Sequence, residues 1–212
     1  AFLIGTPWTV IGFWNAIIGY WLLHGVKNPL ARVSPFIPCS KTHEPLNLRT
    51  AILMTLRNED PARAFTRLRI IRNSLEATGQ GAHFDYFVLS DTSIPAIAAE
   101  EEALFSRWQS EFLDARRTHY RRRAQNDGFK AGNLRNFAEN WGVTYTLMLP
   151  LDADSLMSGV EIVKLATIMQ AHPRIGILQS LVTGTPSQSA FARIFQFGMR
   201  HGMRSYTIGH AW

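Results

Sequence analysis

The sequence contains a single cysteine, Cys39, so it cannot form an intramolecular disulfide. This excludes the small disulfide-stabilised folds and is compatible with a reducing compartment. Two phosphate-binding signatures are also missing: no G-x-G-x-x-G follows the first predicted strand, and no G-x-x-x-x-G-K-[ST] occurs. The usual dinucleotide-binding and P-loop arrangements therefore lose their main support.

Acidic residues are fewer than basic ones, 16 against 22, which gives a formal net charge of +6. This basic balance predicts an anionic partner, and nucleotide phosphates, anionic lipid and nucleic acid all qualify. A chain of 212 residues can hold one good-sized domain. No internal repeat or low-complexity tract is visible.

Charge is missing altogether from residues 1–23, which hold three of the six tryptophans. About 20 uncharged, mostly apolar residues in a helix can span a hydrocarbon core of roughly 30 Å, so we expect a transmembrane helix over residues 1–24. Five residues weaken this pattern: Gly5, Pro7, Gly12, Asn15 and Gly19. A signal peptide or a buried core helix is the alternative. Basic residues such as Lys27 and Arg32 follow, and they predict that the rest of the chain is cytoplasmic.

Residues 25–49 hold four prolines and no convincing period, so we interpret them as a connector. Residues 50–212 alternate between strand and helix patterns and form the predicted domain. The predicted strands are 51–56, 84–89, 145–149 and 175–178, each followed by a predicted helix, with a further helix over 127–141. This order predicts an α/β fold with a mostly parallel sheet flanked by helices. The strand 145–149 is expected to be central and buried on both faces.

Acidic side chains follow three of these strands: Glu59, then Asp91, then Asp152 with Asp154. The carboxyl ends of parallel strands meet at one edge of the sheet, so these side chains should lie together. Two aspartates so placed can hold Mg²⁺ or Mn²⁺ through oxygen ligands, and the ion would bridge to a diphosphate. Lys130, in the first turn of its predicted helix, adds a fixed positive charge.

Each of these residues also has a simpler explanation when it is taken alone. Asp152 and Asp154 could cap a turn, Glu59 and Asp91 could cap helices or complement their dipoles, and Lys130 could be solvated. Together, however, they offer what a nucleoside diphosphate sugar needs. They supply an acceptor for the base and ribose, a cation site for the diphosphate and a positive charge for the leaving group.

The segments that carry these residues resemble family 2 glycosyltransferases of the GT-A fold. Within that family they are most similar to the membrane-bound glucosyltransferases of osmoregulated periplasmic glucan synthesis. The resemblance covers nearly the whole chain and rests on six segments: 54–60 (MTLRNED), 88–91 (VLSD), 120–123 (YRRR), 130–133 (KAGN), 151–155 (LDADS) and 177–180 (ILQS). Two departures are Arg57, where the family usually has tyrosine, and Pro150, where an aliphatic residue is usual.

The resemblance implies an inverting glucosyltransferase that uses UDP-glucose and Mg²⁺ or Mn²⁺ to extend a β-glucan acceptor. Glu59 and Asp91 would contact uridine, Lys130 the diphosphate, Asp152 the nucleotide and the metal, and Asp154 the metal. The protein would be a multi-pass protein of the cell inner membrane, in contact with the lipid bilayer, with its catalytic domain in the cytoplasm. The family's general base and acceptor-binding motif are expected beyond residue 212, and nucleic acid is not an expected partner.

Three alternatives stay open at this point. Another processive family 2 synthase, such as a cellulose-like one, would share the same site. A haloacid-dehalogenase-like phosphatase also places D-x-D at a strand end, but it usually has Thr or Val at the fifth position, where this chain has Leu156. A membrane-anchored basic module could instead bind anionic lipid or nucleic acid through the arginines of residues 116–123. We interpret the arginines at 121–123 as a solvated or lipid-facing patch outside the nucleotide site.

Overall fold

The computed structural model describes residues 2–35, 45–111 and 115–212. Contacts divide the chain into two units, Thr42–Ala171 and a second unit made of Ala1–Lys41 with His172–Trp212. Each unit is described by itself. Part of the predicted connector, including Cys39, lies outside the described residues.

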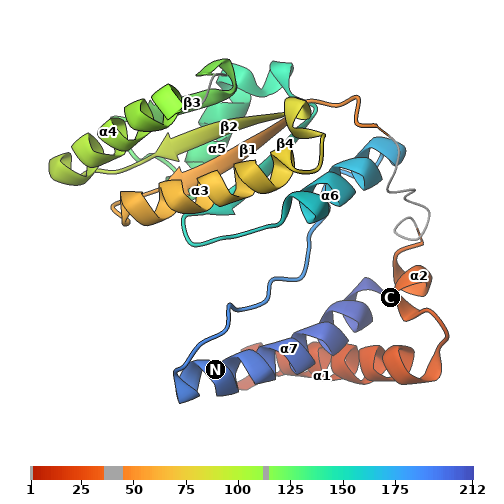
Figure 1. The fold of residues 1–212 in the computed structure, drawn as a ribbon. Helices are drawn as coiled ribbons and strands as arrows, with labels where there is room; N and C mark the ends of the chain where they lie inside the picture. The colour runs from red at the N-terminus through yellow and green to blue at the C-terminus, as the bar shows by residue number, and fades with distance from the viewer. Residues whose placement is uncertain (1, 36–44, 112–114) are drawn as a thin grey trace. The chain divides into compact units, whose positions relative to one another are not determined.

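The unit Thr42–Ala171 is built on a sheet of four parallel strands in the order β3-β2-β1-β4 (Figure 1). The strands are β1 Thr50–Leu56, β2 Phe84–Ser90, β3 Thr118–Arg122 and β4 Leu147–Asp152. The helices are α3 Pro61–Glu76, α4 Pro95–Glu111, α5 Phe129–Trp141 and α6 Gly159–Ala171, with 3₁₀ turns at Gly81–His83, Ala115–Arg117 and Gly142–Thr144. This confirms the predicted α/β fold with a parallel sheet flanked by helices.

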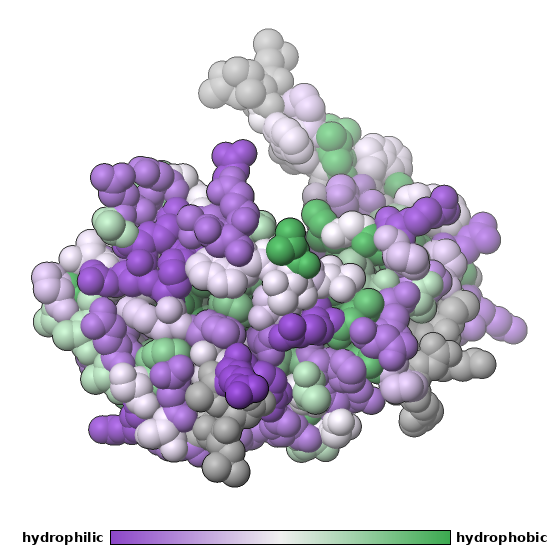
Figure 2. Space-filling view, turned by 90° about the horizontal axis from the view of Figure 1, so that it is seen from above, coloured by the Kyte–Doolittle hydropathy of each residue, from purple (hydrophilic) through white to green (hydrophobic). Residues whose placement is uncertain are grey.

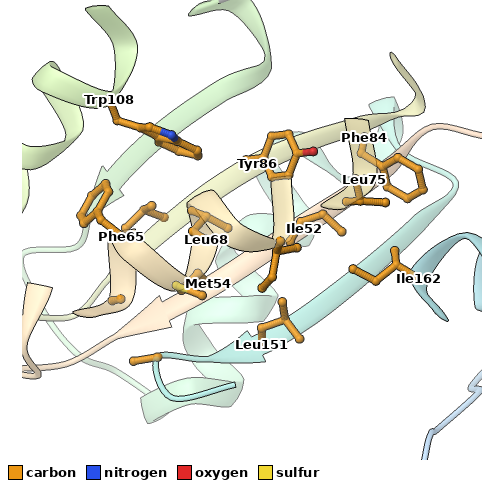
Figure 3. Close-up of a cluster of buried hydrophobic side chains, with 14 of the residues drawn as sticks. Ile52, Met54, Phe65, Leu68, Leu75, Phe84, Tyr86, Trp108, Leu151 and Ile162 are labelled. Carbon is orange, nitrogen blue, oxygen red and sulfur yellow. The ribbon is translucent and has the colours of Figure 1, made fainter. Parts of the chain in front are cut away.

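Neighbouring residues of each strand point to opposite sides of the sheet, so the apolar strands β1 and β2 present apolar side chains on both faces. Helices cover both of these faces. On one face, Ile52 and Tyr86 pack against α3, α4 and α6 (Figure 3). On the other face, Leu53 and Phe87 pack against Phe137 of α5. Strands β1 and β2 are buried along their whole length, as expected of inner strands in a parallel sheet. Hydrophilic residues cover most of the face seen in Figure 2, and hydrophobic ones appear there in small separate groups.

Strand β4 lies at the edge of the described sheet, so the prediction of a central strand buried on both faces is wrong for this structure. Its residues alternate between more and less exposed, and Met148 is 51% exposed. Pro150 stands opposite Leu53 in the ladder with β1. Proline has no N–H to donate and is tolerated at an edge, where one side of the strand needs no partner.

Two other strand predictions differ from the structure. Strand β3 was not expected, because its sequence THYRR is short and basic and shows no apolar alternation; its pairing with β2 forms it instead. Residues 175–178 were expected to be a strand, but no strand lies there in the structure, and Ile177 is 88% exposed. An apolar run becomes a strand only when a neighbouring strand accepts its backbone hydrogen bonds.

The second unit consists of α1 Phe2–Gly25, α2 Pro29–Val33 and α7 Ala190–Ala211. Helices α1 and α7 approach each other closely at two glycines. A Cβ on Gly19 would lie 1.7 Å from the carbonyl oxygen of Ser205, and one on Gly209 would lie 1.8 Å from that of Asn15. Only glycine fits at these two contacts.

The transmembrane helix predicted over residues 1–24 is not supported. Residues 2–25 do form a helix, but in the described part of the chain no helix is both long and apolar enough to cross a membrane. Polar residues, glycines and Pro7 are spread along α1 and lower its mean hydropathy.

Candidate functional site

The parallel strands bring their carboxyl ends to one edge of the sheet, and the predicted site residues follow these ends. Glu59 comes shortly after β1, Asp91 directly after β2, and Asp152 is the last residue of β4. Two backbone hydrogen bonds extend the ladder here, from Asp91 N to Leu56 O at 2.8 Å and from Arg123 N to Ser90 O at 3.0 Å. The loops after β1, β2 and β3 therefore start from fixed positions.

Lys130 and Asp152 form an ion pair across this edge, between the start of α5 and the end of β4. Their side chains are 46% and 63% exposed. An ion pair as exposed as this contributes little to stability, so both groups can turn toward a charged ligand. The structure thus brings together the lysine predicted for the diphosphate and the aspartate predicted for the nucleotide and its metal.

Glu59 lies within the electrostatic influence of Asp152 and Asp154. Loss of hydration raises the pKa of the Glu59 carboxyl above its usual value, and the charges of Asp152 and Asp154 raise it further. A hydrogen bond from Arg57 N to Glu59 Oε2, 3.3 Å long, opposes this shift. Burial is the largest cause of this shift, and the smaller contributions of Asp152 and Asp154 show that the three carboxylates are close enough to influence one another.

The protein supplies only some of the ligands that a divalent ion needs. Among the described residues, no group of three or more His, Cys, Asp or Glu side chains is placed to hold a metal ion. Mg²⁺ is commonly held by one or two carboxylates together with substrate phosphates and water. Asp152 and Asp154 suit an ion that a bound diphosphate completes.

Asp91 is the most buried of the predicted residues, with a side chain only 4% exposed. Both of its oxygens accept hydrogen bonds from Arg123, Oδ1 from Nε at 2.7 Å and Oδ2 from Nη2 at 2.8 Å. A contact between Asp91 and a base would have to use the remaining lone pairs of these oxygens. The predicted contact with uridine stays a prediction.

The basic run is not one solvated patch, as the sequence had suggested. Arg117 donates to Glu76 at 2.8 Å, Arg121 donates to Asn133 O at 3.2 Å, and Arg123 holds Asp91. Arg122 is more exposed, at 41%, and lies 3.8 Å from Glu102. Sequence reasoning left Arg123 out of the site because β3 was not recognised. Once β3 is known, Arg123 directly follows a strand, as Asp91 does.

A buried carboxylate that sequence reasoning also missed joins the loops after β1 and β2. Glu101 of α4 is fully buried and accepts hydrogen bonds from Thr92 Oγ1 at 2.5 Å and Tyr120 OH at 2.9 Å. Thr92 Oγ1 in turn accepts from the backbone N of Asn58, which has a left-handed φ of 58°. The Asn58 side chain accepts from Ser93 N at 2.9 Å. This network fixes the backbone that leads into Glu59.

A hollow of about 620 Å³ lies beside the turn at the start of α5. Its lining includes Arg121, Arg123, Gly128 and Arg135 but none of the five predicted site residues. The hollow is therefore not the place where the predicted residues gather.

A parallel sheet that carries carboxylates and a lysine at its carboxyl edge defines an α/β domain suited to a nucleotide, bound beyond the strand ends. Its arrangement is consistent with the GT-A fold.

Comparison with curated proteins shows which nucleotide-binding α/β proteins this chain is similar to. The chain is 41% identical over 201 residues to the glucans biosynthesis glucosyltransferase H of Caulobacter vibrioides, 38% over 208 residues to that of Dickeya dadantii, and 36% over 211 residues to that of Xanthomonas campestris pv. campestris. These matches cover 94%, 97% and 100% of this chain. They confirm the resemblance found in the sequence. No protein-family profile matches the chain.

The same matches cover 29%, 24% and 32% of the relatives' own lengths. The chain therefore spans between about a quarter and a third of the curated relatives it matches.

Proposed function

We propose that this chain is the nucleotide-sugar-binding part of an inverting glucosyltransferase that transfers glucose from UDP-glucose to a growing β-glucan in osmoregulated periplasmic glucan synthesis. The observation that carries the proposal is the meeting of Lys130, Asp152, Asp154 and Glu59 at the carboxyl edge of the parallel sheet. The names of the relatives, which refer to glucans biosynthesis, support the glucan product.

In the transfer, a hydroxyl oxygen of the acceptor forms a bond to C1 of glucose and gives its proton to a general base, while the bond from C1 to the UDP oxygen breaks. UDP departs with the electron pair and its negative charge grows. Lys130 lies where its ammonium group can neutralise this charge once the diphosphate replaces Asp152 as its partner. Asp152 and Asp154 would hold Mg²⁺ or Mn²⁺, which supplies further positive charge for the departing diphosphate.

The structure does not favour the phosphatase alternative, because the D-x-D segment follows β4, an edge strand, and not the first strand of the chain. Nor does it favour the basic module, because Arg117, Arg121 and Arg123 make contacts inside the protein. The predicted inner-membrane location with a cytoplasmic sheet stays a proposal. It rests on the resemblance to membrane-bound glucosyltransferases, because the charge bias of Lys27 and Arg32 orients a chain only when a membrane-spanning helix precedes them.

The binding of UDP tests this function directly. We expect UDP with Mg²⁺ or Mn²⁺ to raise the melting temperature of the chain, since a ligand that binds only the folded state stabilises it. ADP and GDP with the same ions should raise it less. No shift with UDP at millimolar concentration would contradict the proposal.

Asp154→Ala tests the role of the metal. We expect it to remove the dependence of UDP affinity on Mg²⁺, with a loss of at least about tenfold in affinity, because the ion would lose a ligand. Isothermal titration with and without Mg²⁺ measures this. Glu139→Ala is the matched control, since Glu139 is another exposed carboxylate and forms its ion pair with Arg135 on the same helix. Unchanged metal dependence in Asp154→Ala would remove Asp154 from the site.

A further inference from the structure

The guanidinium group of Arg123 joins the end of β2 to the start of α5. Besides the two bonds to Asp91, it donates to Asn126 Oδ1 at 3.2 Å, Asp127 O at 3.0 Å and Phe129 O at 3.1 Å. Its side chain is only 12% exposed. The planar fork of arginine can make such a set of bonds in several directions, which a lysine cannot.

The segment that Arg123 holds has an unusual backbone. Gly128 and Phe129 are consecutive residues with left-handed φ angles of 67° and 52°. This conformation is disfavoured for a residue with a side chain, so Phe129 needs support from its surroundings. Arg123 supplies such support, because it binds the carbonyl groups on both sides of Gly128, those of Asp127 and Phe129.

The turn is also fixed from the side of α5. A Cβ on Gly132 would lie 1.8 Å from the carbonyl oxygen of Asp127 and 3.2 Å from Arg123 Nη1. The absence of a side chain at Gly132 allows the helix to approach the turn this closely.

Lys130 follows this turn directly and meets Asp152 from β4. The direction in which Lys130 leaves the backbone therefore depends on the conformation of Gly128 and Phe129. That conformation depends on Arg123, and the orientation of Arg123 depends on Asp91.

We propose that Arg123, held in place by Asp91, is a positioning residue that orients Lys130 toward the diphosphate of the bound nucleotide. This inference rests on the proposed function, because it concerns the same nucleotide site. Arg123 acts through the turn Asn126–Phe129 and not by contact with the nucleotide.

A double-mutant cycle tests this role, with affinities for UDP and for uridine measured by titration in the presence of Mg²⁺. Arg123→Gln should weaken UDP binding by at least about tenfold and uridine binding much less, because uridine carries no phosphate for Lys130. Lys130→Ala should weaken UDP binding in the same way. If Arg123 acts through Lys130, adding Arg123→Gln to Lys130→Ala should cause little further loss.

Arg122→Gln is the matched control, because it removes the same charge one position earlier from a more exposed side chain. It should change UDP affinity less than about threefold. Arg123→Lys keeps the charge and is the second variant if Arg123→Gln fails to fold. It should lose part of the UDP affinity, since one ammonium group cannot hold both Asp91 and the turn.

Losses that add up in the double mutant, an equal loss of uridine affinity, or full UDP affinity in both Arg123 variants would overturn the positioning role. These results would leave the proposed function intact. A wild-type chain that binds no UDP would overturn the proposed function itself and this inference with it.

Discussion

At the scale of single residues, the charged groups of the carboxyl edge are linked in pairs that come from different elements. Asp91 after β2 binds Arg123 after β3, and Lys130 of α5 binds Asp152 of β4. The first pair is buried and bidentate, whereas the second is exposed and consists of a single hydrogen-bonded contact. A buried pair resists rearrangement, and an exposed one exchanges its partner readily. The two aspartates therefore suit different tasks, one structural and one in direct contact with ligand.

Asp91→Asn decides whether this aspartate also reads the base. If its carboxylate accepts a hydrogen bond from uracil, the change should weaken binding of uridine by about tenfold even without a metal ion, because an amide is a poorer acceptor for that contact. Titration with uridine, cytidine and guanosine measures this. Equal losses for all three nucleosides would argue against base recognition by Asp91.

The raised pKa of Glu59 makes the free energy of unfolding depend on pH, and the direction of the shift sets the sign of this dependence. Between the ordinary glutamate pKa and the raised one, the folded protein binds more protons at Glu59 than the unfolded chain does. The stabilising contribution of the protonated group is therefore present at low pH and is lost as the pH rises through the folded-state pKa. Urea unfolding from pH 4 to 7 should show this loss, and Glu59→Gln should reduce it.

The same slope in Glu59→Gln as in the wild-type chain would contradict the raised pKa. Glu102→Gln is a suitable control, since Glu102 is an exposed glutamate whose carboxylate lies 3.8 Å from the guanidinium of Arg122.

At the scale of elements, the sequence predicted those whose signals are local. Helix α3 begins at Pro61 after the N-cap Asp60, which accepts from Arg63 N at 3.0 Å, and its apolar face repeats at helical spacing. Strands β1 and β2 were predicted from continuous apolar runs. Strand β3 and the absence of a strand at 175–178 could not be predicted, because pairing with a neighbour decides both.

The site was predictable to the same extent. The carboxylates at strand ends and Lys130 could be placed at one edge because a parallel sheet dictates it. Arg123 and Glu101 could not, because their roles depend on β3 and on a buried contact between loops. A basic run and a glutamate in a helix normally indicate solvent exposure.

Gly132→Ala tests whether the fit of α5 against its preceding turn is as tight as the geometry indicates. Its Cβ would meet the carbonyl oxygen of Asp127 at 1.8 Å, so helix and turn would have to separate. We expect a loss of about 1–3 kcal/mol in the free energy of unfolding, the usual cost of overpacking. Weaker UDP binding should accompany it. Denaturant unfolding and titration measure the two effects.

Gly142→Ala, at the other end of the same helix, is the control. Its Cβ would lie 3.7 Å from that of Ala138, an ordinary contact, and its φ of −56° suits alanine. It should stabilise the protein slightly, by about 0.4–1 kcal/mol, through the unfolded state. Gly132→Ala behaving like Gly142→Ala would show that the contact with Asp127 is loose.

At the scale of the whole molecule, the chain corresponds to between about a quarter and a third of the relatives it matches. Within this part, the carboxylates of the sheet edge already have partners or assigned roles. Asp91 is held by Arg123, Asp152 pairs with Lys130, and Asp154 is assigned to the metal. Glu101 is fully buried among hydroxyl groups. Under the proposed function these carboxylates would serve donor binding, and none of these four would be left to activate an acceptor.

We therefore expect residues 1–212 alone to bind UDP-glucose without synthesising glucan. General-base assistance contributes on the order of 10² to 10⁴ to a rate, and positioning of the acceptor contributes further. The test follows incorporation of labelled glucose in membrane fractions that contain either this chain or a full-length relative such as the Dickeya dadantii protein. Polymer made by residues 1–212 would show that the base lies within them. Glu59, whose raised pKa brings it closer to the range of a working base, would then be the first carboxylate to replace.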